Sequence, residues 1–141
     1  MYLLDTNVVS ELRKIRLGKA DSQVANWADS VDAADLYISV ITVQELEIGI
    51  LLAERRAPTQ GAVFRAWLNK QVLPAFAGRI LAVDMAVAQR SAQFHVPNPR
   101  PVRDRLIAAT ALVHGMAVVT RNVDNFEPTG VAILNPWAKA I

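Results

Sequence analysis

Apolar and polar positions follow two different spacings along this chain. Short apolar runs rich in Val, Ile and Leu predict five strands, at residues 2–4, 36–41, 79–83, 116–119 and 131–134. Between them, apolar residues at helical spacing predict helices, at residues 8–12, 21–35, 43–53, 60–76, 85–94 and 106–114. Strands that alternate with helices indicate βαβ units. We therefore expect an α/β fold, a three-layer sandwich with a mostly parallel central sheet of about five strands, formed as a single domain by residues 1–141.

Acidic residues stand at three points where a predicted strand gives way to a helix. Asp5 follows the first strand, and Asp104 opens the helix that precedes Gly115. Thr42 and Glu45 have the spacing of a capping box, in which Thr42 would be the N-cap and Glu45 would reach back to its amide. A role as a helix cap explains an acid at each position about as well as a role in catalysis or ligand binding does, so no one of them alone identifies a site.

The predicted topology brings these acids together. All strands of a parallel sheet end at one edge, so Asp5, Glu45 and Asp104 are expected to meet there, with Asp124 as a possible fourth. Two carboxylates about 4 Å apart repel by roughly 4 kcal/mol at an effective dielectric of 20, which forces protonation unless a cation is bound. Because the ligands are oxygens and the chain has no Cys, the site would select Mg²⁺ or Mn²⁺. Such an ion typically coordinates a phosphate group of the substrate and activates a water molecule.

Other polar residues have simpler interpretations. Asp84 is predicted to be the N-cap of the helix that follows it, and His95 and His114 are interpreted as structural or solvated. Three basic side chains near the same sheet edge are candidates for binding a phosphodiester backbone: Arg103, Arg105 and Arg121.

Composition narrows the class of protein. The chain has 141 residues, a formal net charge of +2 and no Cys, which excludes a disulfide framework and thiolate chemistry. It lacks the basic and then apolar N-terminal segment of a signal peptide, and no apolar run approaches the roughly 18 residues of a membrane span. We therefore expect a soluble, cytoplasmic protein with no membrane partner.

Aromatic and small residues suggest how the helices pack. Trp27 is predicted to lie in the core, while Phe64 and Trp67 form either core or a face for a protein partner. Gly49 suggests close helix packing or a bend, since a glycine inside a helix costs about 1 kcal/mol relative to Ala. Three prolines make residues 95–101 a stiff loop.

Four segments carry a specific pattern: LLDTNVVSEL from residue 3, SVITVQELEIGI from residue 39, DRLIAATALVHG from residue 104, and VVTRN from residue 118 followed by FEPTGVAILNPW up to residue 137. In this order they resemble the PIN-domain ribonucleases, and specifically the VapC-like toxins of bacterial type II toxin–antitoxin systems. The resemblance covers essentially the whole chain. It implies a Mg²⁺-dependent endoribonuclease that cleaves RNA phosphodiester bonds with a metal-activated water, and it implies Asp5, Glu45 and Asp104 as its acids. It also implies a homodimer and a cognate VapB-like antitoxin, which we expect to cover the apolar helical surface of residues 46–73.

One position departs from the pattern of that family. Many members place a fourth acid just after the strand ending in VVT, where this chain has Asn122, and Asp124 lies two residues further on. Both stay candidates for the fourth site residue, and Asp124 completes the predicted catalytic set with Asp5, Glu45 and Asp104. A missing carboxylate weakens a second metal site most, so we expect one firmly held ion and a second that binds only with RNA.

Three other functions compete with this interpretation. A signalling receiver would need adjacent acids near the first strand and a Lys after a late strand, whereas Asp5 stands alone and Arg121 follows Thr120. A phosphatase with an Asp nucleophile typically has a second Asp two residues on, where this chain has Asn7. The remaining alternative is a catalytically inert PIN-like protein-binding module, which needs no metal. No base-reading motif identifies which RNA is cut.

Overall fold

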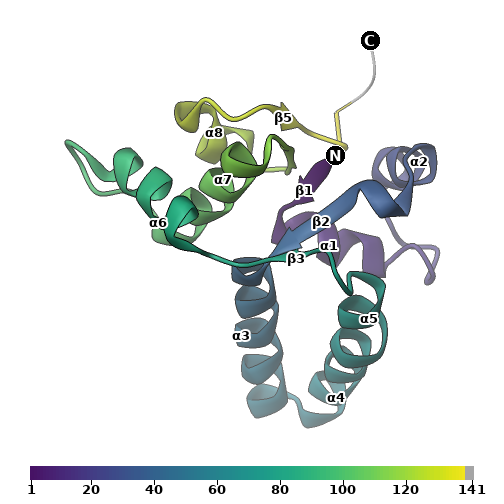
Figure 1. The fold of residues 1–141 in the computed structure, drawn as a ribbon. Coiled ribbons are helices and arrows are strands. Elements are labelled where there is room, and N and C mark those ends of the chain that lie inside the picture. Colours follow the sequence, from purple (N-terminus) through teal and green to yellow (C-terminus); the bar gives the residue numbers. More distant parts are fainter. Residues whose placement is uncertain (139–141) are drawn as a thin grey trace.

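The computed structural model describes residues 1–138, and at its centre is a five-stranded sheet in which every neighbouring pair of strands is parallel. The strands are β1 (Tyr2–Leu4), β2 (Leu36–Ser39), β3 (Ile80–Leu81), β4 (Ala117–Val119) and β5 (Ile133–Leu134). Their order across the sheet is β3-β2-β1-β4-β5, which places the N-terminal strand in the middle (Figure 1). The predicted α/β class and strand number are confirmed, and the two edge strands are shorter than predicted.

Helices connect the strands and cover both faces of the sheet, as the sandwich prediction requires (Figure 1). They are α1 (Thr6–Arg13), α2 (Ser22–Ser30), α3 (Val40–Arg56), α4 (Pro58–Trp67), α5 (Leu73–Ala75), α6 (Met85–Ala92), α7 (Val102–His114) and α8 (Val123–Phe126). A π-helical turn, Leu68–Val72, joins α4 to α5. Within residues 1–138, no helix combines the length and the apolar character needed to cross a membrane.

Alternating side chains of β1 divide the core into two clusters. Leu4 packs in the cluster formed with α1, α3 and the α4–α5 segment, and Leu3 packs in the cluster formed with α7 and α8. Both leucines are fully buried. Ala108 and Ala111 of α7 are also fully buried, and their small side chains let this helix lie close to the sheet. The central strand is therefore covered on both faces, which fixes the residue that follows it.

The start of α3 differs from the sequence prediction. The helix begins at Val40, and Ser39 is its N-cap, whose hydroxyl accepts a hydrogen bond from the backbone N–H of Ile41 at 3.0 Å. The predicted capping box of Thr42 and Glu45 is therefore wrong. Val40 and Ile41 are β-branched and favour a strand in isolation, but their position at the end of β2 places them in the first helical turn. Glu45 is consequently not used as a cap.

The helix predicted for residues 21–35 is also interrupted. α2 ends at Ser30, and Ala33–Asp35 forms a separate 3₁₀ turn. Trp27 is half-buried at the border of the core rather than inside it, and its ring meets that of Tyr2 edge to face with centroids 5.6 Å apart.

Two predicted helix termini are confirmed by their capping contacts. Asp84 caps α6, since its Oδ1 accepts a hydrogen bond from the backbone N–H of Val87 at 3.0 Å. Gly115 ends α7 in the left-handed conformation, with φ of 68°. The other end of α7 lies at Val102, four residues before the predicted start.

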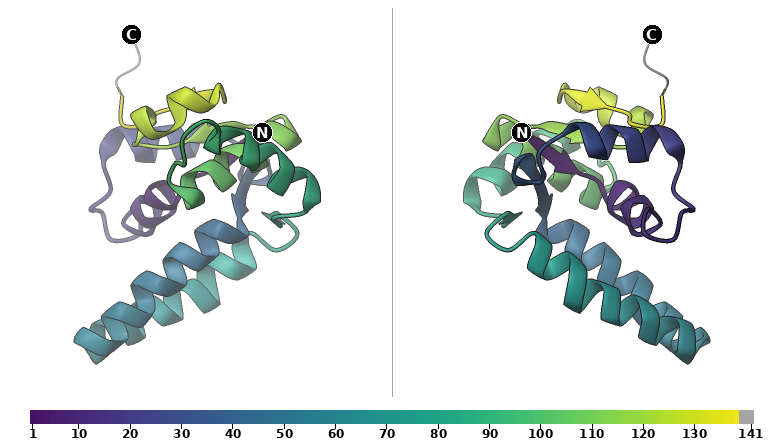
Figure 2. Two further views of the ribbon diagram at one scale, coloured as in Figure 1. Left: turned by 90° about the vertical axis from the view of Figure 1, so that its left-hand side faces the viewer. Right: turned by 90° about the vertical axis from the view of Figure 1, so that its right-hand side faces the viewer.

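α3 and α4 form a helical hairpin that projects away from the sheet (Figure 2). Arg65 of α4 forms ion pairs with Glu47 and Glu54 of α3, at 2.6 and 3.1 Å. The two backbones meet at Gly61, where a Cβ would lie 2.4 Å from the Cα of Glu54. A Cβ at Gly49 would meet nothing within 4 Å outside its own helical turn, so the prediction of close packing at Gly49 is wrong.

Candidate active site

Asp5 lies at the carboxyl end of the central strand and is buried, with 4% of its surface exposed. Its Oδ1 accepts a hydrogen bond from the backbone N–H of Thr6, and its Oδ2 accepts one from the hydroxyl of Thr120, both at 2.8 Å. Its own N–H donates to the carbonyl of Val119 at 2.9 Å. Contacts from the start of α1 and the end of β4 therefore hold this carboxylate in place.

Burial raises the pKa of Asp5 from 3.8 to about 6, because desolvation disfavours the charged carboxylate. The hydrogen bonds from Thr120 and Thr6 favour the charged form and lower the pKa. The negative charges of Asp104 and Glu45 raise the pKa further. Three acids from distant parts of the sequence thus lie within electrostatic range of one another.

Glu45 of α3 is linked to Asp5 through Thr6. The hydroxyl of Thr6 donates to Glu45 Oε1 at 2.7 Å and lies 3.4 Å from the hydroxyl of Thr42. The backbone of Thr6 holds one acid and its side chain holds the other. The second oxygen of Glu45, Oε2, lies 3.8 Å from Nε of Arg103, so a cationic side chain partly balances this carboxylate.

Asp104 lies in the first turn of α7, where the helix dipole favours a negative charge. Its Oδ2 accepts a hydrogen bond from the side-chain amide of Asn125 at 3.3 Å. Asp104 and Glu45 both line a cavity of about 340 Å³ beside the start of α7. The two acids therefore face a shared space that is open to solvent.

The two candidates for a fourth site residue lie after β4. Asp124 is in the first turn of α8 and is exposed. Asn122 is exposed as well, and its backbone N–H donates to the hydroxyl of Thr120 at 3.0 Å. It is Asn125, one residue past Asp124, whose side chain contacts Asp104. The fold thus brings three of the four predicted acids into one electrostatic group and leaves Asp124 at the surface.

The donor atoms of this group fit a hard divalent cation, because they are carboxylate oxygens with hydroxyl oxygens around them. As the side chains stand, no set of three or more His, Asp or Glu residues within residues 1–138 has the geometry to hold a metal ion. Glu45 makes its contacts with Thr6 and Arg103 instead.

The three arginines predicted near this edge occupy different environments. Arg103 pairs with Glu45. Arg121 is exposed, and its guanidinium lies 5.3 Å from the centre of the Trp137 ring. Arg105 is buried, with 6% of its surface exposed. They therefore do not form a continuous basic strip along the sheet edge.

The polar residues that position the acids were not predicted from the sequence. Thr6 and Thr120 each stand at the end of a strand, as the second residue of DTN and the first of TRN, and that position is the signal that could have found them. Asn125 carries no such signal. Its contact with Asp104 depends on how α8 packs against α7.

Comparison with known proteins gives matches over nearly the full chain. The PIN domain family matches residues 2–130. The chain is 39% identical over 145 residues to the VapC ribonuclease Y4jK of Sinorhizobium fredii, and the alignment covers 99% of this chain and 100% of that protein. It is 39% identical over 143 residues to the toxin FitB of Neisseria gonorrhoeae, covering 97% and 99%. The crystal structure of FitAcB from Neisseria gonorrhoeae superimposes with a TM-score of 0.86, 38% identity, and coverage of 97% and 99%.

Proposed function

Because the chain belongs to the PIN-domain family, we propose that it is a Mg²⁺-dependent endoribonuclease that acts as the toxin of a type II toxin–antitoxin system. The observation that carries the proposal is the buried Asp5, linked through Thr6 to Glu45 and within electrostatic range of Asp104. The names of the two full-length relatives, a VapC ribonuclease and a toxin, support the activity and the biological role.

Asp5, Glu45 and Asp104 would hold the cation. Mg²⁺ is the expected ion and Mn²⁺ is possible, because both prefer oxygen ligands. When bound, the cation would neutralise the carboxylates, activate a water for attack on phosphorus and stabilise the leaving oxygen. Asp124 is proposed as the fourth catalytic acid, in a supporting role at the exposed rim of the site.

The protein residues act by positioning. Thr120 holds Oδ2 of Asp5 and itself accepts a hydrogen bond from the backbone of Asn122, so the hydroxyl that orients the carboxylate is held in place as well. The hydroxyl of Thr6 sets the orientation of Glu45, and the amide of Asn125 does so for Asp104. A site whose carboxylates are already oriented loses less entropy when a cation and substrate bind.

A Thr6→Val substitution tests this positioning role. It removes the hydroxyl but keeps the side-chain size and the backbone N–H that holds Asp5. We expect about tenfold lower Mg²⁺ affinity, because Glu45 loses one charge-assisted hydrogen bond. Thr6→Ser keeps the hydroxyl and serves as the matched control. Equal Mg²⁺ affinity of both variants by calorimetry would show that Thr6 does not position Glu45.

We propose a VapB-like antitoxin as the protein partner. Several large apolar side chains of the α3–α4 hairpin are more than a third exposed: Ile48, Leu51, Leu52 and Val63. A groove of about 290 Å³ runs between α1, α3 and α4, and it is lined by Phe64, Trp67 and Glu45. A groove with apolar side chains in its walls that includes a proposed catalytic acid suits a protein that both binds tightly and blocks the site. A homodimer is proposed on the resemblance to VapC-like toxins.

Loss of RNA cleavage in an Asp104→Asn variant tests the function. We expect wild-type protein to cut RNA with Mg²⁺ and not with EDTA, and the variant to lose at least 100-fold in rate, as removal of a major charge-stabilising group does in other enzymes. Asp84→Asn, which changes a capping acid of α6, is the control and should keep full activity. An Asp104→Asn variant that is folded by circular dichroism and cuts RNA at the wild-type rate would refute the assignment.

A further inference from the structure

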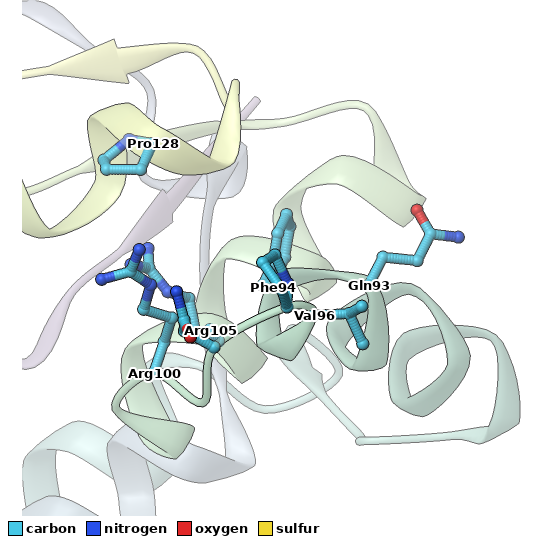
Figure 3. A pocket seen from close by; sticks show the side chains of 8 residues that line it. Gln93, Phe94, Val96, Arg100, Arg105 and Pro128 are labelled. Atoms are coloured by element: carbon cyan, nitrogen blue, oxygen red, sulfur yellow. The ribbon is translucent and has the colours of Figure 1, made fainter.

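A second pocket lies beside the candidate active site, between the 93–100 segment and the start of α7. Its volume is about 230 Å³. Figure 3 shows the side chains around it, with Arg100, Arg105 and Pro128 toward one side and Phe94 and Val96 between them and Gln93. The pocket is lined by two basic residues and by no acidic residue. Its charge is therefore opposite to that of the carboxylate cleft.

Arg105 is the feature of this pocket that calls for a ligand. It is more than nine-tenths buried, and within residues 1–138 it makes no ion pair with a carboxylate. Its Nη1 donates to the backbone carbonyl of Asn125 at 2.7 Å, and its Nε has no hydrogen-bond partner. Burying an unpaired guanidinium is costly, because a charge taken out of water needs an opposite charge or full hydrogen bonding. Arg105 is therefore a buried cation whose charge no carboxylate of the described residues balances.

Arg100 makes the same pocket suitable for an anion from the solvent side. Its side chain is exposed and lines the pocket, and its backbone N–H donates to Nδ1 of His95 at 3.1 Å across the 95–100 loop. Two cationic side chains that face one cavity repel each other unless an anion lies between them. A phosphate has several oxygens and can accept hydrogen bonds from two guanidinium groups at once.

Asn125 connects this pocket to the proposed catalytic acids. Its side-chain amide donates to Asp104, and its backbone carbonyl accepts from Arg105. Arg105 and Asp104 are adjacent on α7, so their side chains leave the helix in different directions. The pocket is thus close to the cleft without being part of it.

We propose that the Arg100–Arg105 pocket binds a phosphate of the RNA substrate that is not the one being cleaved. This inference rests on the proposed ribonuclease function. The size of the pocket fits it, since about 230 Å³ is below the roughly 300–1,000 Å³ of sites for whole small molecules and suits a single charged group. The ring of Phe94 in the wall offers apolar contact to the adjoining sugar or base. The pocket would fix the position of the RNA backbone and would not select for particular bases.

The test measures RNA binding without cleavage. A fluorescein-labelled single-stranded RNA is titrated by anisotropy against the Asp5→Asn protein, alone and with Arg100→Gln or Arg105→Gln added. Each added substitution should weaken binding about tenfold, the size of one charge-assisted hydrogen bond. Each should also reduce the slope of log K against log salt by about 0.7, the value for one phosphate contact of a single strand. Arg56→Gln removes an exposed charge at the end of α3 and is the matched control.

The outcomes separate this inference from the function on which it rests. Wild-type cleavage of the same RNA, measured in parallel, tests the function alone. If the wild type cuts RNA but neither pocket variant changes affinity or salt slope relative to Arg56→Gln, the pocket does not bind substrate. If the pocket variants lose affinity for a copurified antitoxin and keep their affinity for RNA, the pocket is a protein-binding site and the proposal is wrong. Arg100 is exposed, so its variant gives an answer even if Arg105→Gln does not fold.

Discussion

Replacing Asp5 by Asn should stabilise the metal-free protein while it abolishes activity. The ionised carboxylate is unfavourable in its buried position, as its pKa of about 6 against an ordinary 3.8 indicates. Asn has nearly the same shape and no charge. Its amide nitrogen, placed at Oδ2, would donate to the hydroxyl of Thr120 as a protonated carboxyl does.

The size of the effect follows from the pKa. At 1.36 kcal/mol for each pKa unit, the difference between 3.8 and about 6 corresponds to about 3 kcal/mol in the free energy of unfolding. For a protein of this length that is roughly 6–12 °C in melting temperature. The carboxyl is only 4% exposed, so solvent screening reduces the figure little.

The pH dependence has a definite sign. Between pH 4 and pH 6 the folded protein holds a proton on Asp5 that the unfolded chain has released, so stability falls as the pH rises through this range. Above pH 6 the buried charge of Asp5 destabilises the folded protein by the full amount, and below pH 4 this destabilisation is absent. The advantage of Asp5→Asn should therefore be largest at pH 8 and small at pH 4.

Thermal and urea unfolding in EDTA at pH 4, 6 and 8 measure this difference. The exposed Asp29 of α2 provides the control, since Asp29→Asn changes the same charge at the surface. Adding Mg²⁺ at pH 8 should stabilise the wild type and leave Asp5→Asn unchanged. A variant that is less stable than the wild type at pH 8, or whose advantage is equal at pH 4 and pH 8, would show that burial of the charge does not govern this site.

Two further predictions concern the fourth site residue and the hairpin. Asp124→Asn should lower the rate of RNA cleavage less than Asp104→Asn does, and equal losses of cleavage rate in these two variants would contradict this ranking. Asn122→Asp should tighten Mg²⁺ binding in calorimetry, because it adds a carboxylate. Gly61→Ala should destabilise the protein by about 1–3 kcal/mol in urea unfolding, because the new Cβ meets the backbone of α3. Gly49→Ala should stabilise the protein by up to about 1 kcal/mol through helix propensity. The reverse order of stability would refute the packing argument.

Much of the fold could be predicted because it follows from local patterns. The apolar runs and the cap at Asp84 depend on nearby residues. The apolar runs predicted the number of strands and the α/β class, and the cap predicted the start of α6. The start of α3 could not be predicted, since Ser39 and Thr42 are both favoured as N-caps and the end of β2 decides between them. Nor does the sequence say which glycine lies where two helices cross, because that depends on the crossing point.

The candidate site shows the same division. Asp5 and Asp104 could be proposed from their places at the ends of predicted elements. The bond from Thr6 to Glu45 joins residues 39 apart in sequence, and the bond from Thr120 to Asp5 joins residues 115 apart, so both require the folded sheet. The burial of Arg105 likewise depends on the loop that folds over it.

The central position of β1 has a consequence during synthesis of the protein. β1 is synthesised before the other four strands and is held between β2 and β4, and two of the contacts of Asp5 come from Val119 and Thr120, more than 110 residues further along the chain. At about 5–20 residues per second, the ribosome needs roughly 6–23 s to add the 115 residues that separate Asp5 from Thr120. A nascent chain therefore exposes Asp5 early but cannot complete the contacts around it until β4 and Thr120 have been synthesised.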